Sequence, residues 1–268
     1  MSGEAPRDDE PVRLGSMLFT LVEPHRGHEV AYNRWYERAH FYAGCMIGPY
    51  NFAGRRWVAP RRLKDLRPHD TSPIAPDRLT GSYLALYWVL AGNHEEWNRW
   101  AYRQLKQLHA DGRMFEQRDH VHTLLYTFDW EVRRDADGVP SALALDHPFR
   151  GLVAVIGEAT GEGGREALDR WYREEHLPGA LAGSPAALCL SFSPMPLLVD
   201  APGVAKDEGS AARFVHLYFL DDEPGEVFPA QFAAHDEALR ESGLGQVLWS
   251  SPFIPTIPGT DTYTDELW

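Results

Sequence analysis

This sequence has few cysteines, no long apolar run and no excess of basic residues. Its only cysteines, Cys45 and Cys189, each lie within an apolar stretch, so a disulfide scaffold or a cysteine-based metal site is not expected. No apolar run approaches the roughly 20 residues that a membrane helix needs. The net charge of −13 argues against general binding to nucleic acid or to an anionic membrane. We therefore expect a cytoplasmic protein without nucleic-acid or membrane partners.

Familiar cofactor and hydrolase motifs are absent as well. There is no Walker loop, no Rossmann fingerprint, no GxSxG elbow and no paired CxxC. Residues 1–13 are polar and acidic, unlike a signal or transit peptide, and are expected to form a disordered lead-in. The 268 residues, 44% of them apolar, suit two globular domains that each bury a core.

One heptad occurs twice. Residues 34–40 read RWYERAH, and residues 170–176 read RWYREEH. Such a repeat indicates a duplicated domain. Helical spacing then places Tyr32, Tyr36 and His40 on one face of a first helix, as it does Tyr172 and His176 in the second copy.

The order of expected elements is the same in both halves. In the first half we expect strands at 16–23, 50–59, 81–90 and 120–132, helices at 27–45 and 93–111, and a long loop at 60–80. In the second half we expect strands at 151–158, 186–193, 212–220 and 245–250, helices at 164–177 and 226–241, and a loop at 194–211. Each half is thus β-α-β-β-α-β, the ferredoxin-like arrangement, in repeats 14–132 and 151–250. The segment 133–150, with Asp135, Asp137, Gly138 and Pro140, is expected to be a mobile linker, and 251–268 a C-terminal strap across the body.

A ferredoxin-like half whose first helix ends in WYxxxH, followed in the second copy by Leu177 and Pro178, resembles the dimeric α+β barrel superfamily, and within it the EthD-like branch. In that superfamily two chains of about 100 residues join their sheets into one barrel. The resemblance implies an α+β fold in which tandem ferredoxin-like repeats form the barrel within a single chain. The first copy departs from the pattern, with Phe41 and Tyr42 in place of Leu177 and Pro178.

The superfamily places its ligand between the sheet and the helices, so Tyr36 and His40 would face a cavity there. A histidine can give or take a proton near neutral pH, and a tyrosine hydroxyl can hold a developing enolate. Strand alternation puts His120, His122 and Tyr126 on one face, where the histidines would orient the substrate or relay protons. No carboxylate accompanies this HxH pair at a supporting spacing, so no metal is expected. The further residues expected to bind substrate are Tyr32, Trp35, Tyr126, Arg55 and Trp88.

Two other sets of residues are candidates. In the second half Tyr172, His176 and His216 form a smaller set with the same chemistry. Six basic residues between Arg55 and Arg67 would clamp a carboxylate or phosphate, or else form a solvated loop that pairs with the acidic surface.

The function that we favour from the sequence is an enzyme without an organic cofactor. It would act on a small apolar, aromatic or polyketide-like molecule by proton transfer, such as cyclisation, isomerisation or dehydration, in natural-product or aromatic metabolism. The alternatives are a cofactor-independent monooxygenase, a non-catalytic ligand-binding or scaffold protein, and a heme-binding enzyme with a histidine as axial ligand. A homodimer is compatible with each of them.

Overall fold

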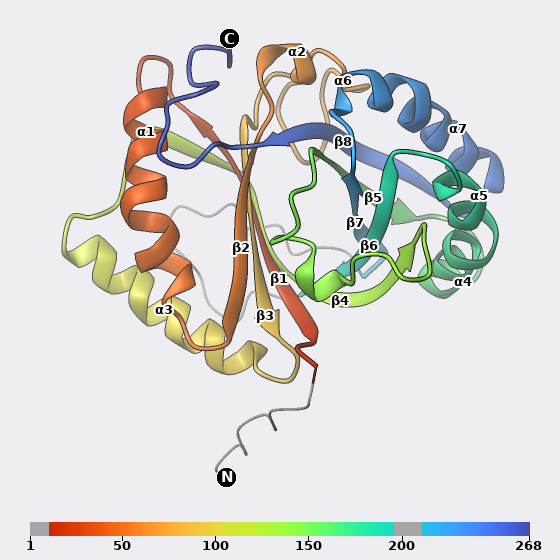
Figure 1. Ribbon diagram of the computed structural model, residues 1–268, viewed down its shortest axis with the longest axis horizontal. Helices are drawn as coiled ribbons and strands as arrows, with labels where there is room; N and C mark the ends of the chain where they lie inside the picture. Colours follow the sequence, from red (N-terminus) through yellow and green to blue (C-terminus); the bar gives the residue numbers. More distant parts are fainter. Residues whose placement is uncertain (1–10, 196–210) are drawn as a thin grey trace.

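A computed structural model describes residues 11–195 and 211–268, and its centre is a closed eight-stranded barrel (Figure 1). All neighbouring strands are antiparallel, in the order β1-β3-β2-β8-β5-β7-β6-β4. The two four-stranded sheets are joined where β2 pairs with β8 and where β4 pairs with β6. The strands are β1 (Leu14–Pro24), β2 (Asn51–Val58), β3 (Tyr83–Leu90), β4 (Arg118–Arg133), β5 (Gly151–Ala159), β6 (Ala186–Pro194), β7 (Arg213–Leu220) and β8 (Gly245–Pro255). This confirms the predicted α+β fold of two ferredoxin-like repeats in one barrel.

The helices cover the outside of the barrel, and the longer helices of the two halves lie on opposite sides (Figure 1). The first half has α1 (Glu29–Trp35), the π-helix η1 (Tyr36–Met46), the short α2 (Arg61–Lys64) and α3 (His94–Ala110). The second half has α4 (Gly164–Trp171), the π-helix η3 (Tyr172–His176), α5 (Leu177–Leu181), α6 (Pro224–Val227), the π-helix η4 (Phe228–Phe232) and α7 (Ala233–Ser242). No helix in the described ranges is long and apolar enough to cross a bilayer.

The strands β1, β3, β5 and β7 bury both faces almost completely, which explains their mostly apolar sequences. On β1 the side chain of Leu18 packs with Val89 and Leu125 under α3. Its neighbours Met17 and Phe19 belong to the core cluster that fills the barrel and includes residues of both halves. The core therefore has an inner part shared by the two repeats and an outer layer under the helices of each.

Both copies of the heptad change from α-helix to π-helix at the motif tyrosine. The change occurs at Tyr36 in the first copy and at Tyr172 in the second. Our sequence analysis assumed an α-helical phase through the whole motif, and that assumption was wrong. A π-helix bonds i to i+5, so residues five apart become neighbours in addition to those four apart.

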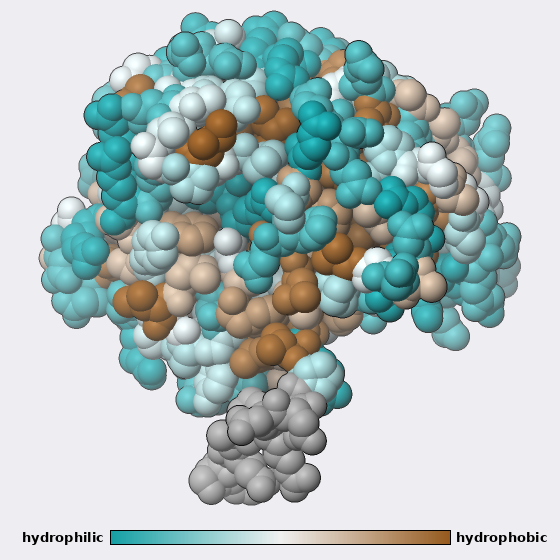
Figure 2. Space-filling view, viewed as in Figure 1, coloured by the Kyte–Doolittle hydropathy of each residue, from teal (hydrophilic) through white to brown (hydrophobic). Residues whose placement is uncertain are grey.

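The connection between the halves packs into one end of the barrel. Ala144, Leu145 and Phe149 are buried, and the Nε1 of Trp88 donates a hydrogen bond to the carbonyl of Ser141. The segment includes a 3₁₀ turn, η2 (Ser141–Leu143). Figure 2 shows apolar side chains near the middle of this face, inside a mostly hydrophilic rim. The expectation of a mobile linker does not hold for residues 141–149, because Ala144, Leu145 and Phe149 pack into the core, although Leu143 is exposed.

Lys64 and Arg67 of the basic stretch are tied into the structure, whereas Arg61 and Arg62 are exposed and form surface ion pairs. Arg67 is buried and donates to the carbonyls of residues 78, 80 and 81 and to the hydroxyl of Ser251. Lys64 is fully buried and donates to Ser82 Oγ, which in turn donates to Glu23. These contacts hold the 60–80 segment against the barrel.

Candidate functional site

The two copies of the heptad have the same local geometry. In the first copy the rings of Trp35 and His40 are stacked, with centroids 4.5 Å apart and an interplanar angle of 20°. In the second copy Trp171 and His176 are stacked at 4.7 Å and 18°. Each pair is five residues apart, so the stacking follows from the π-helical backbone. The duplicated sequence is therefore a duplicated structural unit in which tryptophan fixes the orientation of histidine.

The motif tyrosines point into the layer between helices and sheet. The hydroxyl of Tyr36 lies 2.9 Å from the hydroxyl of Tyr87 on β3. The hydroxyl of Tyr172 lies 3.1 Å from Nε2 of His235 on α7. Burial raises the pKa of Tyr36 and of Tyr172 well above the ordinary tyrosine value. Both hydroxyls are therefore neutral and act as hydrogen-bonding groups.

His40 lies half-buried against Trp35 and the edge of Tyr36. Burial, together with the positive charges of Arg118 and neighbouring groups, lowers the pKa of His40 to about 3. Its Nδ1 is buried without a hydrogen-bond partner. The imidazole is thus neutral at physiological pH. A pKa so far from neutrality makes it an inefficient general acid or base, because efficiency is greatest when the pKa lies near the working pH.

A β-bulge separates the two histidines of the HxH pair. The register between β1 and β4 shifts between Leu21 and Val22, which pair with His122 and His120 respectively. His120 therefore points outward, where its Nδ1 lies 2.9 Å from Thr123 Oγ1. His122 is buried, with its Nε2 2.6 Å from the hydroxyl of Tyr126. The prediction that both histidines share one face was wrong, because the extra residue in a bulge resets the alternation of the strand.

Several residues predicted to bind substrate point into the barrel instead of toward the helices. Tyr126 and His122 lie beside Phe19 of the inner core. Trp88 packs on Phe192 of the other half. Arg55 donates to the carbonyls of residues 145, 147 and 149, which ties β2 to the connection between the halves. The structure thus divides the predicted residues into two separate sets. His122, Tyr126 and Trp88 point into the barrel, whereas the others lie outside it: Tyr32, Trp35, Tyr36, His40 and His120.

The second-half candidates do come together. The ring centroids of Tyr172 and His216 lie 4.4 Å apart, and those of Tyr172 and His176 lie 5.7 Å apart. His235 of α7 completes the cluster, with its ring 5.3 Å from that of His176. The sequence analysis missed His235, although its helical spacing from the buried Phe232 and Leu239 could have indicated that it faces the sheet.

Burial dominates the electrostatics of this second-half cluster. It lowers the pKa of His235 to about 3 and that of His216 well below the ordinary histidine value. Both ring nitrogens of His216 lack hydrogen-bond partners, and the ring packs among Trp130, Tyr172 and Phe214. The environment of His216 is that of a core side chain enclosed by aromatic rings.

A cavity of about 410 Å³ lies beside β2 and η1. The connection between the halves and the segment after β8 complete its wall. Its lining residues are Glu37, Phe41, Tyr42, Gly54, Arg55, Arg56, Leu145, Asp146, Thr256 and Pro258. None of the predicted catalytic residues is among them, whereas the predicted substrate-binding residue Arg55 is.

Arg56 is the unusual member of the cavity wall. It is only 6% exposed, and its guanidinium carbon lies 4.5 Å from the ring centroid of Tyr36 and 5.1 Å from that of Tyr83. Its Nη1 donates to Oδ1 of Asn33 at 2.9 Å, whereas its Nη2 is buried and has no hydrogen-bond partner. In the described part of the chain no carboxylate forms an ion pair with it. A buried cation without a counter-ion is costly, so this guanidinium favours an anionic ligand.

Glu37, the fourth residue of the first heptad, supplies a carboxylate to the same cavity. Its side chain is 10% exposed, and its Oε2 accepts a hydrogen bond of 3.2 Å from the backbone N–H of Gly259. Its Oε1 is 3.7 Å from Nε of Arg38 and accepts no hydrogen bond. Glu37 was not predicted from the sequence. Arg56 was predicted only as one of the six basic residues that would clamp an anion, and Arg55 was the one singled out for substrate binding.

Comparisons with solved structures bear on the fold. A chlorite dismutase-like protein superposes with a TM-score of 0.52 at 12% identity, over 96% of this chain and 100% of that chain. A variant of DypB from Rhodococcus jostii RHA1 in complex with heme gives 0.50 at 11% identity, over 98% of this chain and 99% of that one. The fold is the dimeric α+β barrel. An anthrone oxidase-like protein is also similar, with a TM-score of 0.49, 11% identity, and 94% and 98% coverage. No family model and no curated protein matches the sequence.

Because the similar DypB variant contains heme, we asked whether the space beside the histidines of this barrel could hold one. A porphyrin needs a wide gap beside its axial histidine. In the second half, the space around His176 and His235 is taken by the rings of Trp171 and Tyr172. In the first half, Trp35 stacks directly on His40. The described residues therefore do not fit a heme between helices and sheet, and they contain no group of three or more His, Cys, Asp or Glu that could hold a metal ion.

Proposed function

We propose that this protein is an enzyme that transfers a proton on a small aromatic molecule with an enolisable carbonyl, and that the cavity beside η1 is its active site. The observation that carries the proposal is the buried guanidinium of Arg56, a residue of the cavity wall whose Nη2 has no hydrogen-bond partner. Enolisation creates negative charge on the carbonyl oxygen, and a preorganised donor aimed at that charge stabilises the transition state. The rings of Phe41 and Tyr42 supply apolar wall for an aromatic group.

The proposed step uses two groups of this chain and no cofactor. The carboxylate of Glu37 removes a proton from the carbon next to the carbonyl. The electron pair of the broken C–H bond moves into the carbonyl, and the resulting enolate oxygen accepts hydrogen bonds from Arg56. Return of the proton from Glu37 to another carbon of a conjugated enolate isomerises the substrate. Alternatively, the enolate carbon attacks a second carbonyl of the substrate and closes a ring, and the alkoxide that forms takes the proton from Glu37. The neutral hydroxyls of Tyr36 and Tyr87 adjoin Arg56 and add no competing negative charge.

Our sequence analysis gave the acid/base role to His40, and this role stays a second candidate. Its unpaired Nδ1 favours it, whereas its low pKa and its absence from the lining of the described cavity favour Glu37. The two assignments lie on different sides of η1, so single variants distinguish them.

The experiment follows deuterium incorporation from D₂O into a panel of enolisable aryl ketones, including benzoylacetone and a carboxylated analogue, by NMR. We expect the wild type to accelerate exchange, and Glu37→Gln to lose roughly 10²–10⁴ of the rate, the usual effect of removing a general base. Arg56→Gln should lose roughly 10²–10³. Arg62→Gln, which removes only a surface ion pair with Glu223, is the matched control.

Each outcome decides between assignments. Full activity of Glu37→Gln with loss in His40→Ala would move the acid/base role to His40. Absence of exchange by the wild type, combined with binding of the ketones, would support a non-catalytic ligand-binding protein. Oxygen uptake with an activated phenol, dependent on Arg56, would favour the cofactor-independent monooxygenase, in which the guanidinium holds a phenolate.

A further inference from the structure

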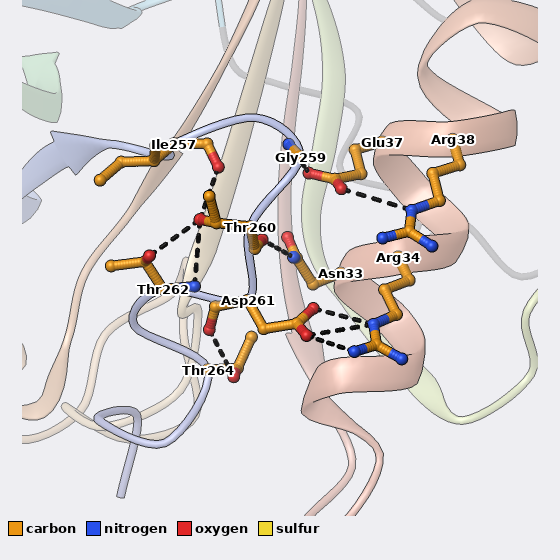
Figure 3. Close-up of polar contacts among 10 residues, drawn as sticks. All are labelled: Asn33, Arg34, Glu37, Arg38, Ile257, Gly259, Thr260, Asp261, Thr262 and Thr264. Carbon is orange, nitrogen blue, oxygen red and sulfur yellow. Dashed lines mark hydrogen bonds and ion pairs between the residues drawn. The ribbon is translucent and has the colours of Figure 1, made fainter.

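The last 13 residues form a strap across α1 and η1. We call residues 256–268 the C-terminal strap; Figure 3 shows its contacts with the helix. The carboxylate of Asp261 accepts from Nε of Arg34 at 3.0 Å. The N–H of Gly259 donates to Glu37 at 3.2 Å. Since Thr256 and Pro258 line the cavity, the strap is one of its walls.

Asn33 connects this strap to the cation of the cavity. It is only 3% exposed, and its Nδ2 donates to the carbonyl of Thr260 at 2.9 Å. Its Oδ1 accepts from Nη1 of Arg56, also at 2.9 Å. A guanidinium can only donate and a carbonyl can only accept, so the amide satisfies both partners in one orientation alone.

We infer that Asn33 is a positioning residue that couples closure of the C-terminal strap to the orientation of Arg56. With the strap closed, the carbonyl of Thr260 fixes the amide so that its oxygen faces the guanidinium. With the strap open, the amide loses this constraint. Nη1 of Arg56 then no longer has a fixed acceptor in Asn33 Oδ1, so the orientation of the guanidinium, and with it of Nη2, is no longer fixed. Closing the cavity wall and preparing the anion site are then one event. The nature of the anion rests on the proposed function, but the coupling does not.

The coupling is testable without any ligand, because coupling free energies are reciprocal. Amide hydrogen exchange of the strap is compared in the full-length wild type, Asp261→Asn and Arg56→Gln. Asp261→Asn weakens the strap directly and should speed exchange of residues 256–264 by about two- to fivefold, given the small free energy of an exposed ion pair. Arg56→Gln should also speed exchange of the strap, although the backbone carbonyl of residue 56 still accepts hydrogen bonds from Thr256 in this variant.

The control for this comparison is Arg62→Gln, which should leave strap exchange unchanged. Strap exchange in Arg56→Gln equal to that of the wild type would overturn the coupling.

Ligand selectivity provides the second readout. Binding of benzoate and of the neutral benzamide is measured by calorimetry in the wild type and in Asn33→Asp. The new carboxylate would pair with Arg56 and could not donate to Thr260, so benzoate affinity should fall tenfold or more while benzamide affinity changes less than about twofold. Equal loss of both would make Asn33 merely structural and contradict the inference. If benzoate fails to bind the wild type, the proposed anion site fails, whereas the exchange comparison still decides the coupling.

Discussion

His235 allows a quantitative test of the packing around the second heptad. Its Nε2 lies 3.1 Å from the hydroxyl of Tyr172 and 3.3 Å from that of Tyr218, and burial lowers its pKa to about 3. In the unfolded chain the pKa returns to roughly 6.5. Between these values the unfolded state binds a proton that the folded state does not. Stability contributed by this histidine is therefore present at neutral pH and is lost as the pH falls below the unfolded value.

The size of the effect follows from linkage. At pH 5, a shift from roughly 6.5 to about 3 removes about 2 kcal/mol of unfolding free energy relative to pH 7. The assay is urea unfolding at both pH values, followed by tryptophan fluorescence, for the wild type and for His235→Gln, which does not titrate.

Other histidines titrate in both proteins and cancel in this comparison. The stability advantage of the wild type over the variant should shrink by about 2 kcal/mol between pH 7 and pH 5. An advantage that stays the same at both pH values would show that His235 titrates normally in the folded protein.

Three further predictions concern packing, buried charge and heme. Gly44→Ala should destabilise the protein by about 1–3 kcal/mol in urea unfolding, because a Cβ there would lie 2.9 Å from the ring of His40. Gly179→Ala, which meets nothing within 4 Å, should be neutral or stabilising, and equal effects would refute the contact. Arg67→Met should lower the unfolding free energy by about 3–5 kcal/mol in the same assay, because it leaves buried carbonyls without a donor. The control Arg61→Met, which removes a surface ion pair, should lower it by about 0.5 kcal/mol. After incubation with hemin and gel filtration, the protein is expected to show no Soret band; a stoichiometric band would contradict the packing argument.

The fold was predictable because its information is repeated and local. The heptad at 34–40 and 170–176 indicated the duplication, and apolar runs such as 81–90 indicated strands buried on both faces. The order of these elements then identified each ferredoxin-like half. Closure of the barrel through β2–β8 and β4–β6 followed from the resemblance rather than from any residue pattern.

The site was predicted less well because it depends on local departures from regular geometry. The π-helix at Tyr36 stacks His40 on Trp35, which a regular α-helical phase does not predict. The bulge in β4 sends His120 and His122 to opposite faces. The bulge leaves no clear mark on the sequence, whereas the π-helix recurs in both copies of the heptad and was not recognised as its structural meaning.

The same limitation applied to the basic stretch. Strand alternation requires that Arg55 and Arg56 point to opposite faces of β2. The sequence could not tell which of them would be neutralised by carbonyl groups and which would be left with an unpaired nitrogen. Only the packed connection between the halves, which binds Arg55, decides this.

The most direct test of the anion site is a crystal structure of the full chain grown with benzoate. The account predicts a carboxylate in the cavity beside η1, within hydrogen-bonding distance of Nη2 of Arg56, with the C-terminal strap closed over it. A carboxylate of the protein itself bound to that nitrogen, or benzoate bound only elsewhere, would contradict the account.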